Sequence, residues 1–331
     1  MSSSSGLPVI LYCYDGSPFS RRVTCYLALR DIGYMKCIQP RILPRPDLAR
    51  LGVHYRRIPV LSIGRDIYLD SRLILQKLED LAQDGPHFTP DASPESKILS
   101  RLFETLVMDA GLVRYVVIIL LASSPALSNS VFLKDRMDLI GDTIPLNEEA
   151  LMAARPEAIN EVKNIIALLE TTLLADGREW IMNTKTPSLA DIEMSWPLHW
   201  VFTTPGCFAE NEISSKVFPQ VFGWVERLQA MVSAREAQLS RPRELSGEEA
   251  AEQIVASAYN ESPSQEQNNS SDLQQGQLVE LWPTDTGSRH KTLGRLIGLN
   301  SKELTVETIG DMSVRVHAPR HGFKVAAYNE K

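Results

Sequence analysis

The sequence lacks an apolar run long enough to suggest a membrane span. The most apolar stretch, residues 115–122, is eight residues long, whereas a spanning helix needs about 20. The first six residues, Met-Ser-Ser-Ser-Ser-Gly, also lack the charged start and apolar core of a signal peptide. We therefore expect a cytoplasmic protein with no membrane partner.

Cysteine is scarce, and no two cysteines form a Cys-x-x-Cys pair. The four are Cys13, Cys25, Cys37 and Cys207. In a chain of 331 residues this number and spacing do not suggest a disulfide framework. We expect reduced thiols, with Cys13 inside the core of a strand.

A broad basic excess is absent as well. The chain carries 41 acidic and 34 basic side chains, a formal net charge of −7, which argues against general nucleic-acid binding. Hydrophobic residues at 44% and charged residues at 23% are typical of a soluble globular protein. The length corresponds to about two domains, with room for a small third module.

Residues 7–84 alternate between strand and helix patterns. Apolar residues fill a short run at 8–14, recur at helical spacing from 18 to 32, and flank Gly64-Arg65 as a hairpin over 57–69. A second strand is expected at 36–40, and Ile74, Leu78 and Leu81 mark another helix. The order strand–helix–strand–loop–strand–strand–helix predicts one small α/β domain.

Residues 94–240 show helical periodicity and no strand signals. One amphipathic stripe runs from Ile159 to Leu173, and a later helix begins near Leu189. Ser188, with Asp191 three residues on, resembles a capping box with Asp in place of the usual Glu. We predict an all-helical second domain.

The last 91 residues divide into a polar segment and a strand-rich one. Residues 241–276 hold seven acidic and two basic side chains and few large apolar ones, which predicts a linker, with a short helix over 248–259 still open. Residues 277–331 contain four or five short strand patterns separated by turn residues. They predict a small β-barrel or meander module.

Three of the six histidines, His290, His317 and His321, fall in this last module close to several arginines and lysines. A metal site would need convergent ligands with thiol or carboxylate companions, and a nucleic-acid surface would need more aromatic side chains. We expect no metal, and a solvated β module that docks on the helical domain.

Three short motifs in the first domain can carry chemistry, and each also has a structural explanation. Ser17 before Pro18 suits a helix N-cap, or a hydroxyl facing an anion or thiolate at the positive end of a helix. Ile58-Pro59-Val60 places proline inside an apolar strand, as expected at an edge, a turn or a cis bond. Asp70-Ser71 suits another N-cap, or an anion site in which Asp70 recruits an ammonium.

Together and in this order, the motifs resemble the glutathione transferase family. The resemblance consists of Ser-Pro-Phe-x-x-Arg-Val at 17–23, Ile-Pro-Val at 58–60, Asp-Ser at 70–71 and Pro-Ser-Leu-Ala-Asp-Ile at 187–192, and it covers roughly residues 7–240. It is closest to the classes that use serine. The implied fold is a thioredoxin-like α/β domain at 7–84 followed by a helical domain at 94–240.

The resemblance also implies roles for individual residues. Ser17 would hydrogen-bond the glutathione sulfur and stabilise its thiolate, and Ile58, Pro59 and Val60 would offer backbone groups to the cysteinyl part. Asp70 and Ser71 would bind the γ-glutamyl end. Phe19 and Arg22 would support the start of the helix, and the co-substrate pocket would include Tyr14 and Tyr115.

The predicted activity follows from these roles. Glutathione, as co-substrate, would attack a hydrophobic electrophilic small molecule or assist its isomerisation, and the family suggests a homodimer. Serine at both 17 and 20 argues against thiol–disulfide exchange by the protein, and Asp70 is one methylene shorter than the Glu or Gln of many relatives. The alternative is a non-catalytic scaffold or interaction module built on the same two domains.

Overall fold

The computed structural model describes residues 6–81, 94–141, 143–262 and 272–329. The amino-terminal part follows the predicted order of strands and helices, with one short extra helix in the loop. Its elements are β1 (Val9–Cys13), α1 (Pro18–Leu29), β2 (Met35–Ile38), α2 (Pro46–Arg50), β3 (Val60–Ile63), β4 (Asp66–Leu69) and α3 (Ser71–Leu81). The strands lie in the order β2-β1-β3-β4, with β1 and β2 parallel and the other two pairings antiparallel. The predicted thioredoxin-like α/β unit is confirmed.

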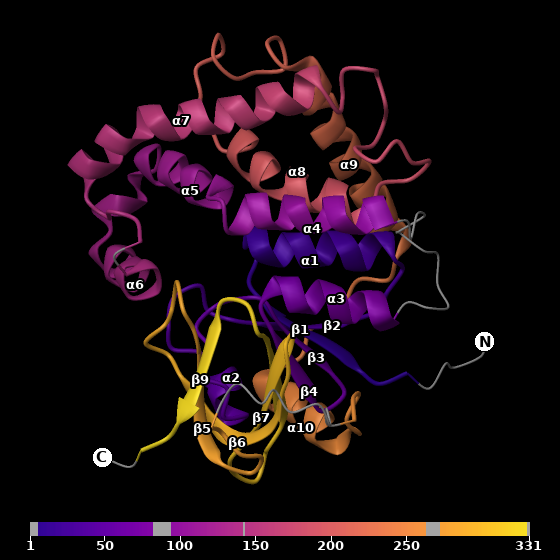
Figure 1. Cartoon of the computed structure of the whole chain (residues 1–331), viewed down its shortest axis with the longest axis vertical. Helices are drawn as coiled ribbons and strands as arrows, with labels where there is room; N and C mark the ends of the chain where they lie inside the picture. The colour runs from indigo at the N-terminus through magenta and orange to yellow at the C-terminus, as the bar shows by residue number, and fades with distance from the viewer. Residues whose placement is uncertain (1–5, 82–93, 142, 263–271, 330–331) are drawn as a thin grey trace.

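The second part of the chain is helical, as predicted. It contains α4 (Pro94–Met108), α5 (Leu112–Ala122), a 3₁₀ turn (Pro125–Ser128), α6 (Ser130–Ile140), α7 (Glu148–Thr171), α8 (Leu189–Phe202) and α9 (Pro219–Gln238). In Figure 1 α4, α5, α7, α8 and α9 lie above α1 and α3, α6 lies to their left, and the strands lie below. Helix α8 packs against both α1 and α4, so it joins the two parts of the molecule.

The predicted capping box at the start of α8 is present. The Ser188 N–H and hydroxyl both donate to Asp191 Oδ2, at 2.7 and 2.8 Å. Asp191 is fully buried, and its Oδ1 also accepts hydrogen bonds from the Ile181 N–H and the Trp224 indole N–H. This carboxylate therefore fixes the start of α8 against both the preceding loop and α9.

The stretch Pro94–Ala122 is long and apolar enough, by length and composition, to span a membrane. We predicted no such stretch, because the most apolar run that we identified, residues 115–122, is only eight residues long. In the structure the stretch is two helices, α4 and α5, with a break at residues 109–111. Helix α4 packs on α8 and α5 packs on α7. Core helices of soluble proteins pass the same test, so this feature is weak evidence for a membrane segment.

Much of the segment predicted as a linker packs on the first domain. Residues 243–245 run beside β2, where the Lys36 N–H donates to the Arg243 carbonyl and the Leu245 N–H to the Lys36 carbonyl. Helix α10 (Gly247–Ala256) corresponds to the short helix that the sequence allowed over 248–259, and it packs on α2. Gly247 permits this approach, since a Cβ there would lie 1.9 Å from Asp47 Oδ1. Residues 263–271, the most polar core of the predicted linker, lie outside the described residues.

The last five strands are β5 (Leu278–Pro283), β6 (Thr292–Leu299), β7 (Glu303–Thr308), β8 (Arg315–Pro319) and β9 (Phe323–Ala327). They lie side by side in the order β8-β7-β6-β5-β9, which is a meander over β5 to β8 only. Strands β5 to β8 pair antiparallel in sequence order, and β9 returns to pair with β5. We call these five strands the C-terminal sheet.

The C-terminal sheet is not separate from the rest of the fold, because it is joined to the sheet of the amino-terminal part. Strand β8 pairs in parallel with β4, with Tyr68 opposite His317, so a single nine-stranded sheet runs through the molecule. We expected docking on the helical domain, and a contact of that kind exists, since the Gly287 N–H donates to the Leu139 carbonyl. The main attachment is to β4 instead, because this strand would otherwise leave an unpaired edge. The domain bounds 7–84, 94–240, 241–276 and 277–331 therefore remain a proposal.

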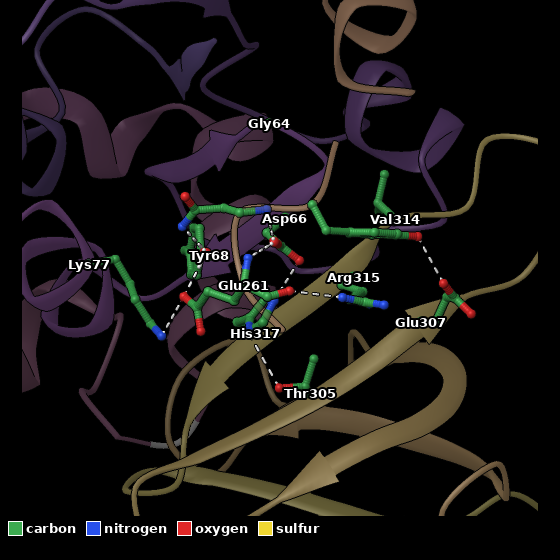
Figure 2. Close-up of polar contacts among 12 residues, drawn as sticks. Gly64, Asp66, Tyr68, Lys77, Glu261, Thr305, Glu307, Val314, Arg315 and His317 are labelled. Carbon is green, nitrogen blue, oxygen red and sulfur yellow. Dashed lines mark hydrogen bonds and ion pairs between the residues drawn. The ribbon is translucent and has the colours of Figure 1, made fainter. Parts of the chain in front are cut away.

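A buried ionic cluster closes the seam between β4 and β8 (Figure 2). The His317 ring lies between two carboxylates, with Nε2 2.9 Å from Asp66 Oδ1 and Nδ1 2.6 Å from Glu303 Oε1. Asp66 Oδ2 also accepts the backbone N–H groups of Asn260 and Glu261. The two carboxylates outweigh burial and raise the pKa of His317 above its ordinary value.

Three groups of this cluster, Glu261, Glu303 and His317, are close enough together to hold a metal ion. The Lys77 ammonium already lies 2.6 Å from a Glu261 oxygen and 2.9 Å from a Glu303 oxygen. The positive charges of Lys77 and His317 thus neutralise these carboxylates. The arrangement is explained by ion pairing, and the predicted lack of a metal stays a prediction.

Candidate functional site

Ser17 lies at the amino-terminal end of α1 and is buried. Its Oγ accepts a hydrogen bond from the Ser20 N–H at 3.2 Å, and Pro18 occupies the first turn. The N-cap interpretation of Ser17 is therefore confirmed. Among the described residues no acceptor takes the hydroxyl hydrogen of Ser17, which leaves a donor at the positive end of a 12-residue helix.

Arg22 connects the expected site to the helical domain. Its fully buried guanidinium donates from Nη1 to Ser71 Oγ at 2.8 Å and from Nη2 to the carboxylate of Glu193 on α8. Burial raises the pKa of Glu193. Arg22 was predicted to support the helix start, but Glu193 was not predicted, because nothing in the α8 pattern distinguishes Glu193 from a solvated residue.

Residues 58–60 run from a loop into β3. The Ile58–Pro59 peptide bond is cis, which is one of the explanations we gave for a proline within this apolar run. Val60 begins β3 and pairs with Tyr12 of β1 on one side and Leu69 of β4 on the other. The segment therefore lies next to the strand that leads into Ser17.

Asp70 and Ser71 lie at the start of α3, where the Asp70 carboxylate is paired with two arginines; its predicted role at the γ-glutamyl end stays a prediction. Its carboxylate accepts three hydrogen bonds at 3.0 Å from the backbone and guanidinium of Arg72, and its Oδ2 lies 3.6 Å from Arg57 Nη1. These two arginines lower the pKa of Asp70 to about 2. The Ser71 hydroxyl oxygen accepts from Arg22, and among the described residues no acceptor takes its hydrogen.

A cavity of about 330 Å³ opens beside Ser17, between α1, α8 and α9. Of the predicted site residues it includes Tyr14, Ser17 and Arg22 in its lining, and it does not include residues 58–60, Asp70, Ser71 or Tyr115. Phe19 contributes indirectly, since its ring lies 4.8 Å from that of Trp196, which lines the cavity. Tyr115 is half-buried on α5.

Most residues of the cavity wall were not among the predicted site residues. Trp196, His199, Arg21 and Lys36 line the cavity, and none of these four was among the predicted site residues. Burial and the charge of Arg21 lower the pKa of His199, so this ring is uncharged at neutral pH. The i, i+3 and i+4 spacing from Trp196 to Trp200 was visible, but it does not separate a core stripe from a cavity wall.

Two of the four cysteines, Cys13 and Cys25, line the cavity beside Ser17, and neither was predicted as a site residue. All four are buried free thiols. Burial is the main cause that raises the pKa of Cys13 and Cys25 to about 11 and of Cys37 to about 12. The core position predicted for Cys13 is confirmed, and these thiols are poorly suited to form a reactive thiolate.

Comparison with known proteins identifies the amino-terminal part. Residues 11–87 match the model of the glutathione S-transferase N-terminal domain, and residues 116–237 match a model described as a domain of unknown function, DUF7962. Glutathione S-transferase U1 of Arabidopsis thaliana is 30% identical over 101 residues. That match spans 30% of this chain and 44% of the relative, so it covers less than half of the curated protein.

Solved structures extend the similarity to the rest of the chain. A GST-like protein from Pseudomonas syringae is 21% identical with a TM-score of 0.67, and the match covers 97% of this chain and 99% of that one. The beta-etherase LigF from Sphingobium sp. strain SYK-6 is 18% identical with a TM-score of 0.54 over 70% of this chain and 100% of its own. Residues 11–87 therefore match the family of the glutathione S-transferase N-terminal domain, and the chain as a whole has the fold of the GST-like proteins.

Proposed function

We propose that this chain is a glutathione transferase that activates the glutathione thiol through Ser17. The observation that carries the proposal is the Ser17 hydroxyl, which has an unused hydrogen, stands at the positive end of α1 and borders a cavity. A free thiol has a pKa near 8.5, so only a few per cent is thiolate at pH 7. A hydroxyl donor and the helix dipole both favour the charged form.

Glutathione would lie across the edge formed by Ser17, residues 58–60 and the start of α3. Its cysteinyl backbone would pair with the chain around the cis Ile58–Pro59 bond. A carboxylate of its γ-glutamyl end would accept the N–H and hydroxyl of Ser71, which Arg22 holds in position. These placements rest on the local geometry and on the family of residues 11–87.

The co-substrate would occupy the cavity beside Ser17. Trp196 and Trp200 supply aromatic surface, Tyr14 stands at the Ser17 end, and Lys36 brings positive charge, whereas Arg21 is paired with Glu236, which also lines the cavity. The thiolate would attack an electrophilic carbon there: a sulfur–carbon bond forms, and the electron pair leaves with the departing group or moves into a conjugated double bond. Tyr115 lies outside this wall and has no role in the proposal.

Replacement of Ser17 tests this function. In Ser17→Ala the thiol loses its hydroxyl donor, so turnover of glutathione with a chromogenic aryl halide at pH 7 should fall about tenfold or more, since a hydrogen bond to a charged group contributes about 1.5–3 kcal/mol. Ser246→Ala is the matched control, because Ser246 caps α10 in the same way and does not line the cavity. Equal turnover in the two variants would remove Ser17 from its role, and a wild-type protein without any turnover would favour a non-catalytic scaffold.

A further inference from the structure

Two loops of the C-terminal sheet lie against the expected γ-glutamyl site. The loop between β5 and β6 contacts Arg57, whose Nε donates to the Thr286 carbonyl at 2.9 Å and whose Nη2 pairs with Asp285. In the loop between β8 and β9, a Cβ at Gly322 would lie 3.1 Å from Arg72 Nη2. The Thr284 N–H donates to the Gly322 carbonyl and ties the two loops together.

The charged side chains at the start of α3 form a chain of ion pairs through two arginines, Arg72 and Arg57. Arg72 binds Asp70 on one side and Asp109 of the chain after α4 on the other, with Nη1 3.3 Å from Asp109 Oδ1. Arg57 lies between Asp70 and Asp285. Asp70 is 5% exposed and has two guanidinium partners, so its carboxylate has little capacity left for a further cation.

Asp285 differs from Asp70 in its exposure and in its number of ion-pair partners. Its side chain is 56% exposed, and Arg57 is its one ion-pair partner among the described residues. A carboxylate has about four acceptor positions, so Asp285 can accept further N–H donors from outside the protein. It is also joined to Asp70 through one guanidinium, which places it at the same end of α3 as Ser71.

A γ-glutamyl group carries an α-ammonium and an α-carboxylate on one carbon, so its site needs an anion next to an anion-binding group. Resting on the proposed function, we propose that Asp285 is the carboxylate that receives the α-ammonium of glutathione, while Ser71 receives its α-carboxylate. The C-terminal sheet thus contributes a specificity-determining residue to the glutathione site, in the place that the sequence analysis gave to Asp70.

The test is a calorimetric titration of the full chain with two probes. One is glutathione, and the other is deamino-glutathione, in which hydrogen replaces the α-ammonium. Asp285→Asn should weaken binding of glutathione about tenfold and leave binding of deamino-glutathione unchanged, because only the first makes the ammonium–carboxylate contact. Asp311→Asn, an exposed aspartate in the loop between β7 and β8, is the matched control and should change neither.

Other results overturn the proposal in distinguishable ways. If Asp285→Asn weakens both probes equally, Asp285 acts by positioning Arg57; if it weakens neither, the residue is not in the site. Tighter binding of glutathione by the variant would make Asp285 an internal competitor for the ligand carboxylate. Wild-type protein that does not bind glutathione at all would overturn the proposed function together with this inference.

Discussion

The seam between β4 and β8 leads to a prediction about His317. Both ring nitrogens lie within hydrogen-bond distance of a carboxylate, so both carry hydrogen and the ring is charged. Replacement by glutamine keeps a polar side chain but removes the charge, and it leaves Asp66 buried with one fewer partner. Removing one member of a buried ion pair costs about 3–5 kcal/mol.

The structure places the expected loss toward the lower end of that range. Asp66 Oδ2 keeps its two backbone N–H donors, and Glu303 keeps the ammonium of Lys77. We expect His317→Gln to lower the free energy of unfolding by about 3 kcal/mol, a large part of the roughly 5–15 kcal/mol of a typical domain. Because the folded-state pKa of His317 is raised, the stabilisation is complete below its ordinary pKa near 6.5 and is lost as the pH rises through the folded value.

Urea unfolding of the wild type and the variant, at a series of pH values from about 6 upward, measures this difference. Hydrogen exchange of the β4 and β8 amides shows whether the loss is at the seam. His321→Gln is the matched control: its side chain is 57% exposed and pairs with Asp109, so its loss should stay below about 1 kcal/mol. Equal losses in the two variants, or a His317 difference that does not shrink with rising pH, would refute the reasoning.

Two further predictions concern the interior. Asp191→Ala should lower the free energy of unfolding by about 3 kcal/mol or more, because four donors, including the Trp224 indole N–H, lose their acceptor; urea unfolding measures it, and a loss below about 1 kcal/mol would contradict the assigned role. The four buried thiols should react with a thiol reagent at neutral pH only after denaturant is added, since burial raises their pKa; rapid labelling of the native protein would show that one of them is accessible.

Local patterns were sufficient to predict the order of elements in residues 7–84 and the capping box of α8. Alternation, helical spacing and the offset of three between Ser188 and Asp191 depend on neighbouring residues, so a single sequence contains them. The parallel pairing of β4 with β8 joins residues nearly 250 positions apart. Nothing in the strand pattern of 313–317 indicates its partner, and the C-terminal sheet therefore appeared as a separate module.

The candidate site was predictable only where local sequence patterns indicate it. Ser17 and Ser71 were identified because each begins a helix after a recognisable strand. Asp70 was expected to bind an ammonium, since its two arginine partners are not apparent from composition; Arg57 reaches it from a preceding loop. Glu193 was missed because its contact with Arg22 is made between distant segments, and the contact of the proposed residue Asp285 with Arg57 is of the same kind.

The pKa of the glutathione thiol bound to the protein tests the central claim most directly. Ultraviolet absorbance of the thiolate, followed as a function of pH, gives this value for the wild type, Ser17→Ala and the Ser246→Ala control. We predict a pKa below 8.5 in the wild type and in the control, and a rise of about one unit or more in Ser17→Ala. The same pKa in all three proteins would contradict the account.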